Sequence, residues 1–386
     1  MTIRSPGREA SRPLPRSVVI LRSNPVDPDP RVEKAARTLA RAGWQVVVVG
    51  WDRTGTLPAS RLDEWGRTDR LGPRASFGRG LGNAPATFRW QIRLLGWLAQ
   101  RRREYTHIHA CDFDTVLPAL IAQRLWKKHV VYDIFDFYAD QFRHTPGWMR
   151  SLVRRFDRWA VGQADAVILV DEARRVQIEG TKPRRVEIIY NTPEDTLANL
   201  DRQPVPPHAG LRLAYVGLLQ VERGLPSWIA VVGRHPDWIL DLAGFGGDEP
   251  HLRSLAQAHP NIHFHGRIPY ARGLQLMHGA DVLTAIYDPA IANHRLASPN
   301  KLFEAMMLGR PVIVARGTNI DRLVEEHGCG IVVPYGDEAA LEGALVRLAA
   351  DPSLRRRLGR AGRKAYLARY TWTMMERRLG DLYASL

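Results

Sequence analysis

Short apolar runs alternate with longer amphipathic segments along almost the whole chain. The run WQVVVVG at 44–50 is nearly continuous in apolar residues and rich in β-branched valine. Such a run is typical of a strand buried on both faces of a parallel sheet. Similar runs recur, separated by segments of helical length, and predict strands at 17–23, 44–50, 107–110, 129–134, 165–170, 186–191, 211–217, 238–244, 261–266, 281–287, 311–316 and 330–335.

The alternation of strands and helices predicts an α/β protein with two doubly wound, Rossmann-like domains of parallel sheet. A polar, Pro-containing stretch at 201–210 separates the two series of strands. Ligands of such sheets bind beyond the carboxyl ends of the strands, so we expect the site in a central cleft that both domains face. The expected parts are a disordered basic arm at 1–16, domains at 17–200 and 201–370 and a last helix at 371–386, with a loop at 51–85 and closing helical stretches at 337–349 and 352–386.

The composition is typical of a soluble globular protein, with 45% hydrophobic and 25% charged residues among 386. No apolar run reaches bilayer length, and the first residues do not resemble a secretory signal. Cys111 and Cys329 are the two cysteines, a usage that suits a reducing cytosol. The net charge is +15, of which +11 falls in residues 1–200. This charge favours polyanionic partners, but no helix-turn-helix, zinc-finger or RNP motif points to a specific nucleic acid.

The segment SPNKLFEAMMLGRPVIV at 298–314 carries the sharpest chemical signal. Ser298 is a good N-cap and Pro299 suits the first helical position. The free N–H groups of such a helix start suit a phosphate, to which Lys301 in the first turn adds a charge. Glu304, one turn further on, is placed to accept hydrogen bonds from a ribose diol. The alternative is a capped surface helix with a solvated lysine and glutamate.

Two glycine-containing turns follow predicted strands of the second half. In YVGLLQVERGLP a strand ends at Gly217, and Arg223 stands at the entrance of the next helix. In LAGFGGDEP, Gly244 and Gly246 permit close backbone approach to a ligand, although GxGG is not a dinucleotide fingerprint. The alternatives are a surface arginine and a tight turn without a ligand.

Acidic residues follow several predicted strands of the first half. Asp112 and Asp114 form a DxD after the strand that carries His107 and His109, and no metal-ligand set of diagnostic spacing accompanies them. We therefore expect no metal. Asp29 and Pro30 resemble an N-cap and first helical residue, and further acidic side chains lie at Asp133 and Asp136.

Together these segments resemble the retaining glycosyltransferases of family 4, which have the GT-B fold. The resemblance covers about residues 17–386 and is carried by IHACDFDTVLPAL, VYDIFDFY, EIIYNTPE and above all SPNKLFEAMMLGRPVI. It implies that the last helix crosses back to the N-terminal domain. It also implies catalytic roles for His109, Arg223 and Lys301, and nucleotide-sugar binding by Gly217, Arg223, Gly244, Gly246, Arg267, Ile268, Ser298, Asn300, Lys301, Leu302 and Glu304. Asp29, Arg31, Asp112, Asp133 and Asp136 are candidates for the acceptor side.

The sequence departs from the family pattern at specific positions. Leu296 stands where the family's first Glu of the E-x7-E motif usually contacts the donor sugar, with Asn293 or His294 as possible steric substitutes. Leu218 replaces an arginine that often accompanies the phosphate-binding cation, and Cys111 replaces a histidine. Phe135-Asp136 stands in place of a His-Glu pair.

The resemblance implies metal-independent transfer with retention from a UDP- or GDP-linked sugar, without a further cofactor. Basic amphipathic segments at 88–103 and 148–160 favour an anionic membrane surface, and hence a cytoplasmic protein peripheral to the inner face of the membrane with a lipid-linked or cell-surface glycan acceptor. The alternative is that their apolar stripes pack on the sheet. A nucleotide-sugar epimerase and a non-catalytic sugar-nucleotide binder remain as other functions.

Overall fold

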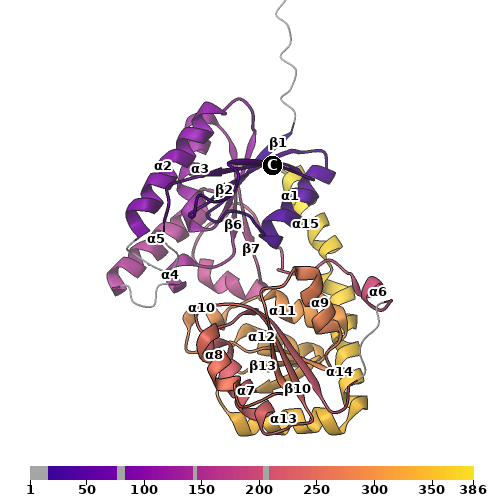
Figure 1. Ribbon diagram of the computed structural model, residues 1–386. Coiled ribbons are helices and arrows are strands. Elements are labelled where there is room, and N and C mark those ends of the chain that lie inside the picture. Colours follow the sequence, from indigo (N-terminus) through magenta and orange to yellow (C-terminus); the bar gives the residue numbers. More distant parts are fainter. Residues whose placement is uncertain (1–15, 76–82, 142–145, 203–207) are drawn as a thin grey trace, which may run out of the picture. The chain divides into compact units, whose positions relative to one another are not determined.

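The computed structural model describes residues 16–75, 83–141, 146–202 and 208–386, which form two compact units (Figure 1). Unit 1 comprises residues up to Leu169, Ile178–Glu187 and Leu379–Leu386. Unit 2 comprises Val170–Gln177 and Ile188–Arg378. The arm expected at 1–16 lies outside the described residues, except for Arg16.

Unit 1 is built on an eight-stranded sheet of order β3-β4-β2-β1-β5-β6-β7-β8, in which only β3 pairs antiparallel among the described pairings. Its strands are β1 (Ser17–Arg22), β2 (Gln45–Trp51), β3 (Ser60–Asp63), β4 (Gly66–Leu71), β5 (His107–Cys111), β6 (His129–Ile134), β7 (Ala166–Leu169) and β8 (Val186–Ile188). Its helices are α1 (Pro30–Arg41), α2 (Ala84–Gln100), α3 (Phe113–Trp126), α4 (Tyr138–Gln141) and α5 (Gly147–Gln163), and the 3-10 helix η2 (Glu172–Ile178) follows β7.

Helices cover both faces of this sheet (Figure 1). Helices α2, α3 and α5 lie on one face, where Trp90 of α2 stacks on Trp51 with ring centroids 5.1 Å apart. Helix α1 and the end of α15 (Trp372–Ala384) lie on the other face, where Tyr383 contacts Trp44. The predicted doubly wound arrangement is confirmed for this unit.

The expectation of a loop at 51–85 is wrong for part of that segment. Strands β3 and β4 form a hairpin there, and β4 pairs parallel with β2. Both strands are rich in charged residues, so they lack the apolar run that marks a buried strand. Thr68 and Arg70 are nevertheless buried, because Thr68 donates to Asp63 and Arg70 donates to the carbonyl of Pro25.

Unit 2 contains a six-stranded parallel sheet of order β11-β10-β9-β12-β13-β14. Its strands are β9 (Arg212–Leu218), β10 (Ile239–Phe245), β11 (Ile262–Gly266), β12 (Val282–Ala285), β13 (Val312–Ala315) and β14 (Gly330–Val333). Its helices are α6 (Leu197–Leu200), η3 (Val221–Arg223), α7 (Leu225–Gly233), α8 (Glu249–Ala256), α9 (Tyr270–His278), α10 (Ala292–Arg295), α11 (Asn300–Leu308), α12 (Asn319–His327), α13 (Glu338–Ala350), α14 (Pro352–Ala365), the π-helix η4 (Tyr366–Tyr370) and most of α15. All the predicted strands are present, with ends shifted by a few residues.

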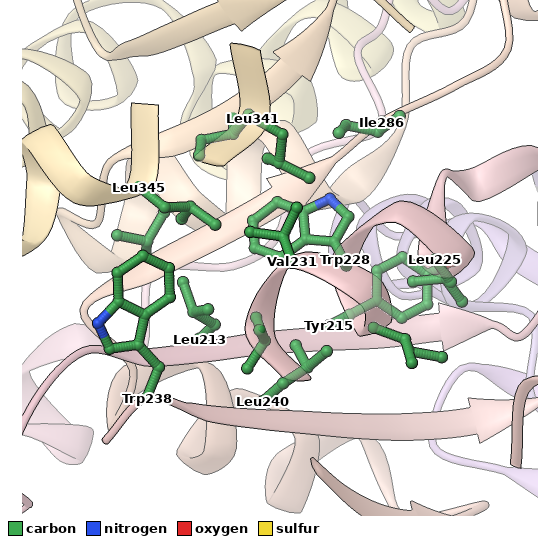
Figure 2. Close-up of a cluster of buried hydrophobic side chains, with 14 of the residues drawn as sticks. Leu213, Tyr215, Leu225, Trp228, Val231, Trp238, Leu240, Ile286, Leu341 and Leu345 are labelled. Carbon is green, nitrogen blue, oxygen red and sulfur yellow. The ribbon is translucent and has the colours of Figure 1, made fainter. Parts of the chain in front are cut away.

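Each face of this second sheet has its own apolar core. On one face Trp228 of α7 is fully buried among side chains of the sheet and of α13, including Leu240 and Leu341 (Figure 2). On the other face Phe303 and Met306 of α11 pack with Tyr370. Helix α11 is therefore anchored along its length, which fixes where its first turn lies.

The closing stretch is not one continuous helix over 352–386. Helix α14 passes into η4, and Thr371 is extended with φ −65° and ψ 147° before α15 begins. The break places Tyr366 and Tyr370 in the core of unit 2, where both are buried. The end of α15 then belongs to unit 1.

Helix α5 carries a buried carboxyl group, that of Asp157. Asp157 has no exposed surface and accepts a hydrogen bond from the Tyr132 hydroxyl. Burial raises the pKa of Asp157 to about 7, although the Tyr132 hydrogen bond opposes the shift. The folded protein thus binds this proton more tightly than the unfolded chain, so its contribution to stability is full at acid pH and is lost as pH rises towards 7.

We predict that Asp157→Asn reduces the decline in the free energy of unfolding between about pH 4 and pH 7 and leaves the part due to other carboxyl groups whose pKa is raised, such as Asp112. At pH 8 the free energy of unfolding of the variant should equal that of the wild type or exceed it by up to about 1–2 kcal/mol, because the variant buries no charge at this position. Urea denaturation at a series of pH values measures both effects. Tyr132→Phe is the control and should destabilise the protein at every pH; an unchanged pH slope in Asp157→Asn would contradict the assignment.

Candidate functional site

The carboxyl end of the sheet in unit 2 brings a lysine against a glycine. Lys301, in the first turn of α11, lies so close to Gly217 at the end of β9 that a Cβ built on the glycine would be 2.4 Å from its Nζ. The neighbouring turn is equally tight, because a Cβ on Gly244 would lie 1.7 Å from the Gly217 carbonyl oxygen. Both glycines have positive φ, 156° and 142°. Neither turn has room for a side chain at these positions, because the Lys301 ammonium lies next to Gly217 and the Gly217 backbone lies next to Gly244.

Aromatic rings and a carboxylate surround this ammonium. Its Nζ lies 5.0 Å from the centroid of the Tyr215 ring. Burial lowers the pKa of Lys301, but Tyr215, Tyr287 and Glu304 more than offset this and hold it above its usual value. Lys301 is therefore a fixed, permanent positive charge at the edge of the sheet.

A second cation, Arg223 of η3, lies beside it. Its guanidinium is 4.3 Å from the centroid of the Tyr287 ring. Its Nε and Nη1 are buried and make no hydrogen bond with any described residue. Buried N–H donors without a partner are costly, and an anion satisfies them well. The arrangement suits an anion.

The start of α11 differs in detail from the expectation. The helix begins at Asn300 with Pro299 as N-cap, so Ser298 is not the N-cap. Pro299 is extended, with φ −77° and ψ 142°, which delays the first helical residue by one. The Ser298 hydroxyl and the Asn300 side-chain oxygen are buried without a hydrogen bond to any described residue. Both polar groups are available to a ligand at this helix start.

One turn further along α11, Glu304 is 5% exposed and accepts a hydrogen bond of 3.0 Å from the Tyr270 hydroxyl. This contact orients the carboxylate. Leu302, from the same expected set, is fully buried in the core and offers no side chain to a ligand.

The remaining expected donor residues lie at the ends of β10 and β11. Gly246 packs against the backbone of Leu219, since a Cβ there would lie 2.1 Å from its carbonyl oxygen. Arg267 is exposed and stacks on Phe245, with its guanidinium carbon 5.0 Å from the ring centroid. Ile268 follows, partly buried.

The position of the missing family glutamate is occupied by the C-cap of a short helix, Leu296 of α10. Two residues earlier, His294 is buried, with its ring 5.3 Å from that of Tyr287 and its Nδ1 3.1 Å from the Asp288 carbonyl. The Asn293 side-chain oxygen is buried without a hydrogen bond to any described residue. Of the two substitutes considered, Asn293 thus has the available polar atom.

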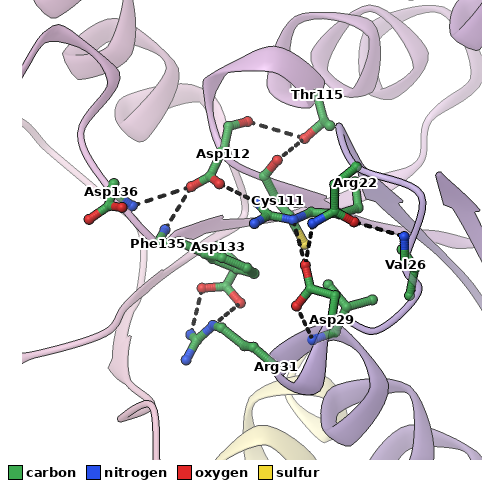
Figure 3. Close-up of polar contacts among 12 residues, drawn as sticks. Arg22, Val26, Asp29, Arg31, Cys111, Asp112, Thr115, Asp133, Phe135 and Asp136 are labelled. Carbon is green, nitrogen blue, oxygen red and sulfur yellow. Dashed lines mark hydrogen bonds and ion pairs between the residues drawn. The ribbon is translucent and has the colours of Figure 1, made fainter. Parts of the chain in front are cut away.

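In unit 1, charged side chains meet at the carboxyl ends of β1, β5 and β6 (Figure 3). Arg22 donates to Asp29 at 2.8 Å and also pairs with Asp112. Asp29 caps α1 as expected, accepting from the Val32 N–H at 3.3 Å. The pKa of Asp29 is lowered, because Arg22 and a hydrogen bond from Asn24 outweigh burial.

Asp112 has an unusual backbone, with φ 64° and ψ 173°. This region is almost restricted to glycine, and a non-glycine residue there typically costs about 1–3 kcal/mol. The side chain accepts from the backbone N–H groups of Phe135, at 2.8 Å, and Asp136, at 3.4 Å (Figure 3). Burial raises its pKa to about 6 in spite of Arg22. A strained carboxyl group with a raised pKa at a strand end is a common feature of functional sites.

Arg31 and Asp133 form a buried, bidentate ion pair, with N–O distances of 2.7 and 3.1 Å. The Phe135 ring lies against Arg31 and Arg22, at 4.8 and 4.2 Å from their guanidinium carbons. These contacts bring the expected acceptor-side residues together at one edge of the unit 1 sheet.

His109 is 1% exposed, and both of its ring nitrogens have protein partners. Nδ1 lies 2.8 Å from the Tyr383 hydroxyl and Nε2 lies 3.2 Å from Asp133. His109, Cys111 and Asp133 are close enough together to be considered as metal ligands. Arg31 already neutralises Asp133, and Arg22 adds a second cation nearby, so these donors fit a metal ion poorly.

Sequence reasoning missed several of these residues. In the sequence Arg22 is only one residue of the predicted strand at 17–23, and Tyr215, Tyr270 and Tyr287 carry no motif of their own. Tyr383 is 274 residues from His109 in the chain, so no local pattern links the two.

Comparison with known proteins gives the family. A model of the glycosyl transferase 4-like domain matches residues 28–192, and one of glycosyl transferases group 1 matches residues 212–351. A phosphatidyl-myo-inositol mannosyltransferase of Mycobacterium leprae is 30% identical over 303 residues, 76% of each chain. The chain belongs to the GT-B glycosyltransferases of family 4 type.

Further relatives and solved structures agree with this assignment. A GDP-mannose-dependent monoacylated alpha-(1-6)-phosphatidylinositol monomannoside mannosyltransferase of Corynebacterium glutamicum is 30% identical over 160 residues, 40% of this chain and 41% of its own. The sucrose-phosphate synthase of Thermosynechococcus elongatus has a TM-score of 0.79 at 20% identity, with 96% of this chain and 99% of that chain covered. Anabaena HepE in complex with UDP and glucose has a TM-score of 0.72 at 17% identity, with 96% and 100% covered. The expected GT-B fold is confirmed.

The close contact between Gly217 and Lys301 gives a test of this candidate site. Gly217→Ala should displace the flexible ammonium and lower kcat/KM by about 10- to 100-fold, because small misplacements of charged groups are costly. The melting temperature should also fall, because alanine is strained at the positive φ of this position, so kcat/KM is measured at a temperature where the variant is fully folded.

Gly247→Ala is the matched control for this variant, because a Cβ at Gly247 meets nothing within 4 Å. It should keep kcat/KM near the wild-type value. Equal activity of the two variants would remove Lys301 from the reaction site.

Proposed function

We propose that the protein transfers a sugar, with retention of configuration, from a UDP- or GDP-linked donor to a lipid-linked or cell-surface glycan acceptor. The observation that carries the donor part is the anion site of unit 2, where Lys301 and the unsatisfied Arg223 donors lie beside the start of α11. The acceptor part rests on two relatives whose names specify phosphatidylinositol-type acceptors.

The two cations explain how the leaving group is stabilised. Negative charge develops on the departing diphosphate as the bond to the sugar breaks, and preorganised donors aimed at that charge lower the barrier. Arg223 supplies two N–H groups, Lys301 supplies an ammonium, and the first turn of α11 adds backbone N–H groups. Two such fixed cations carry the charge that a divalent metal ion carries in other transferases, so we propose metal-independent transfer.

The chemistry needs no protein nucleophile in this proposal. The acceptor hydroxyl attacks the anomeric carbon on the face that the diphosphate leaves, and its proton passes to the departing phosphate oxygen. Glu304, oriented by Tyr270, accepts hydrogen bonds from the donor ribose. The stacked pair Arg267 and Phe245 offers a flat surface for the base.

In unit 1 the proposal assigns His109 a positioning role. Its two nitrogens are bonded to Tyr383 and Asp133, so its ring fixes Asp133 and, through it, Arg31. The strained Asp112 and the rim around Phe135 then form the acceptor side.

A second candidate is a sugar-nucleotide binder without transferase activity. It is favoured by Leu296, an apolar side chain at the position where a carboxylate usually contacts the donor sugar. The buried, unsatisfied oxygen of Asn293 favours the enzyme instead, because it offers the sugar a polar contact.

The first prediction of this proposed function concerns the donor. Thermal-shift titration with UDP, GDP, ADP and their sugar conjugates should show stabilisation by one base, because a ligand at 100 times its Kd adds about 2.7 kcal/mol. The shift should be unchanged by EDTA and strongly reduced in Glu304→Ala. For the preferred donor, NMR of the product should show the anomeric configuration of the donor sugar.

Different results separate the candidate functions. Binding without turnover on any lipid or glycan acceptor supports the non-catalytic binder. An inverted product, or loss of binding with EDTA, contradicts the mechanism. No response to any nucleotide contradicts the proposal as a whole.

The membrane part rests on the exposed face of α5. Trp148, Leu152 and Trp159 are 66, 58 and 42% exposed, so they do not pack on the sheet. Arginines 150, 154 and 155 are exposed among them.

On α2 the stripe of Trp90, Leu94, Trp97 and Leu98 is buried, whereas Phe88 and Ile92 are exposed. No described helix is both long and apolar enough to cross a bilayer. We propose that the exposed face of α5 rests on the anionic inner surface of the membrane.

The second prediction tests this surface by flotation with anionic liposomes. Trp148→Ser/Leu152→Ser should reduce the floated fraction several-fold, because buried apolar area and basic charge act together. Leu125→Ser is the matched control, since Leu125 is 65% exposed at the far end of α3. Wild-type binding that is absent, or equal loss in both variants, would contradict the membrane face.

A further inference from the structure

A cavity of about 320 Å³ opens on unit 1 at the amino ends of β1, β2 and β4. Ser17 and Gln45, the first residues of β1 and β2, line it, and the arginine-carboxylate network lies at the opposite ends of the strands. Arg22, which ends β1, is five residues from Ser17, a span of roughly 16 Å along a strand. The cavity is therefore separate from the acceptor-side residues.

The cavity forms where the described part of the chain leaves one face of a central strand partly uncovered. Ser17 pairs with Gln45, and Val19 pairs with Val47, which in turn pairs with Arg67 of β4, so these side chains share one face. Helix α2 covers this face as far as Trp97, which is 7% exposed. Beyond Trp97 the helix ends, and Val47 remains only partly buried although parallel strands are usually covered on both faces.

The walls combine apolar and aromatic surface with a polar floor. Val19, Val47, Trp97 and Tyr105 provide the apolar side chains. The Ser17 hydroxyl at the floor is buried and makes no hydrogen bond with any described residue. Pockets of this size and composition are typical of small-molecule sites.

The rim is basic. Arg67, Arg101 and Arg103 line it with one carboxylate, Glu104, and Arg67 is paired with Asp69 at 3.0 Å, so Arg101 and Arg103 supply the excess positive charge. The Arg101 guanidinium stacks on Trp97 at 4.7 Å and is 3.9 Å from Glu104, which leaves its N–H groups weakly paired with that carboxylate. Charge complementarity therefore favours a dianion at the rim, attached to an apolar group that fills the interior.

We propose that this cavity binds a phosphomonoester with an apolar ring, its phosphate on Arg101 and Arg103 and its ring against Trp97 and Val47. The site is additional to the sugar-nucleotide and acceptor sites. It lies in unit 1 alone, so its occupancy does not depend on the proposed transfer reaction.

The test is binding of 1-naphthyl phosphate to the full-length protein, measured by calorimetry with saturating UDP and GDP to occupy the nucleotide site. We expect saturable binding with a Kd below about 1 mM. Arg101→Ala/Arg103→Ala should weaken it by at least about tenfold, because two charge-assisted contacts are lost. Val47→Phe should abolish it by filling the cavity, with the melting temperature as a check on folding.

Arg102→Ala is the matched control, because Arg102 lies in the same turn but donates to the Ala99 carbonyl and does not line the cavity. It should leave the Kd within about twofold of the wild type. 1-Naphthol, which lacks the phosphate, should bind at least about tenfold more weakly. The proposal is overturned if 1-naphthyl phosphate does not bind saturably, or if Arg102→Ala weakens binding as much as the double variant does.

Discussion

The proposed donor site in unit 2 depends on how closely two backbone turns and one ammonium approach each other. A Cβ on Gly244 would collide with the carbonyl of Gly217, and a Cβ on Gly217 would collide with the ammonium of Lys301. The two glycines thus bring β9, β10 and α11 close enough for Lys301 to lie over the strand ends. The core beneath α11, with Phe303 and Met306 fully buried, holds the helix in that position. Close packing in unit 2 is therefore the condition for its fixed charge.

Unit 1 differs from unit 2 in that it buries both positively and negatively charged side chains at the carboxyl ends of its strands. Asp133 is satisfied by Arg31 and His109, and Asp29 by Arg22 and Asn24. Removing one partner from such a network leaves a buried charge uncompensated, which is strongly destabilising. The network thus holds Asp112 in a backbone conformation that it would otherwise leave. Rigidity at this edge comes from paired charge, whereas in unit 2 it comes from packing.

The sequence predicted the strands well because buried parallel strands are apolar runs, and such runs as 129–134 are visible without any knowledge of their neighbours. It missed β3 and β4, whose residues are largely polar and whose burial depends on partners such as Pro25. It placed the start of α11 one residue early, since the conformation of Pro299 decides the cap and is not encoded by residue preference alone. Local signals thus specify elements, and contacts between elements specify their exact ends.

The same distinction explains which candidate site residues the sequence marks. Lys301, Glu304 and Arg223 lie in motifs with fixed spacing, so the chain itself marks them. Tyr383 has no such mark, because its partner His109 is far away in sequence and the contact forms only when the end of α15 joins unit 1. This contact also changes how His109 is understood. A histidine whose two ring nitrogens are hydrogen-bonded to protein groups cannot present one to a substrate without first losing a partner, and this is the reason for the proposed positioning role, in which His109 holds Asp133 and Arg31 in place. The motif locates the residue, and the hydrogen bonds around it decide what the residue does.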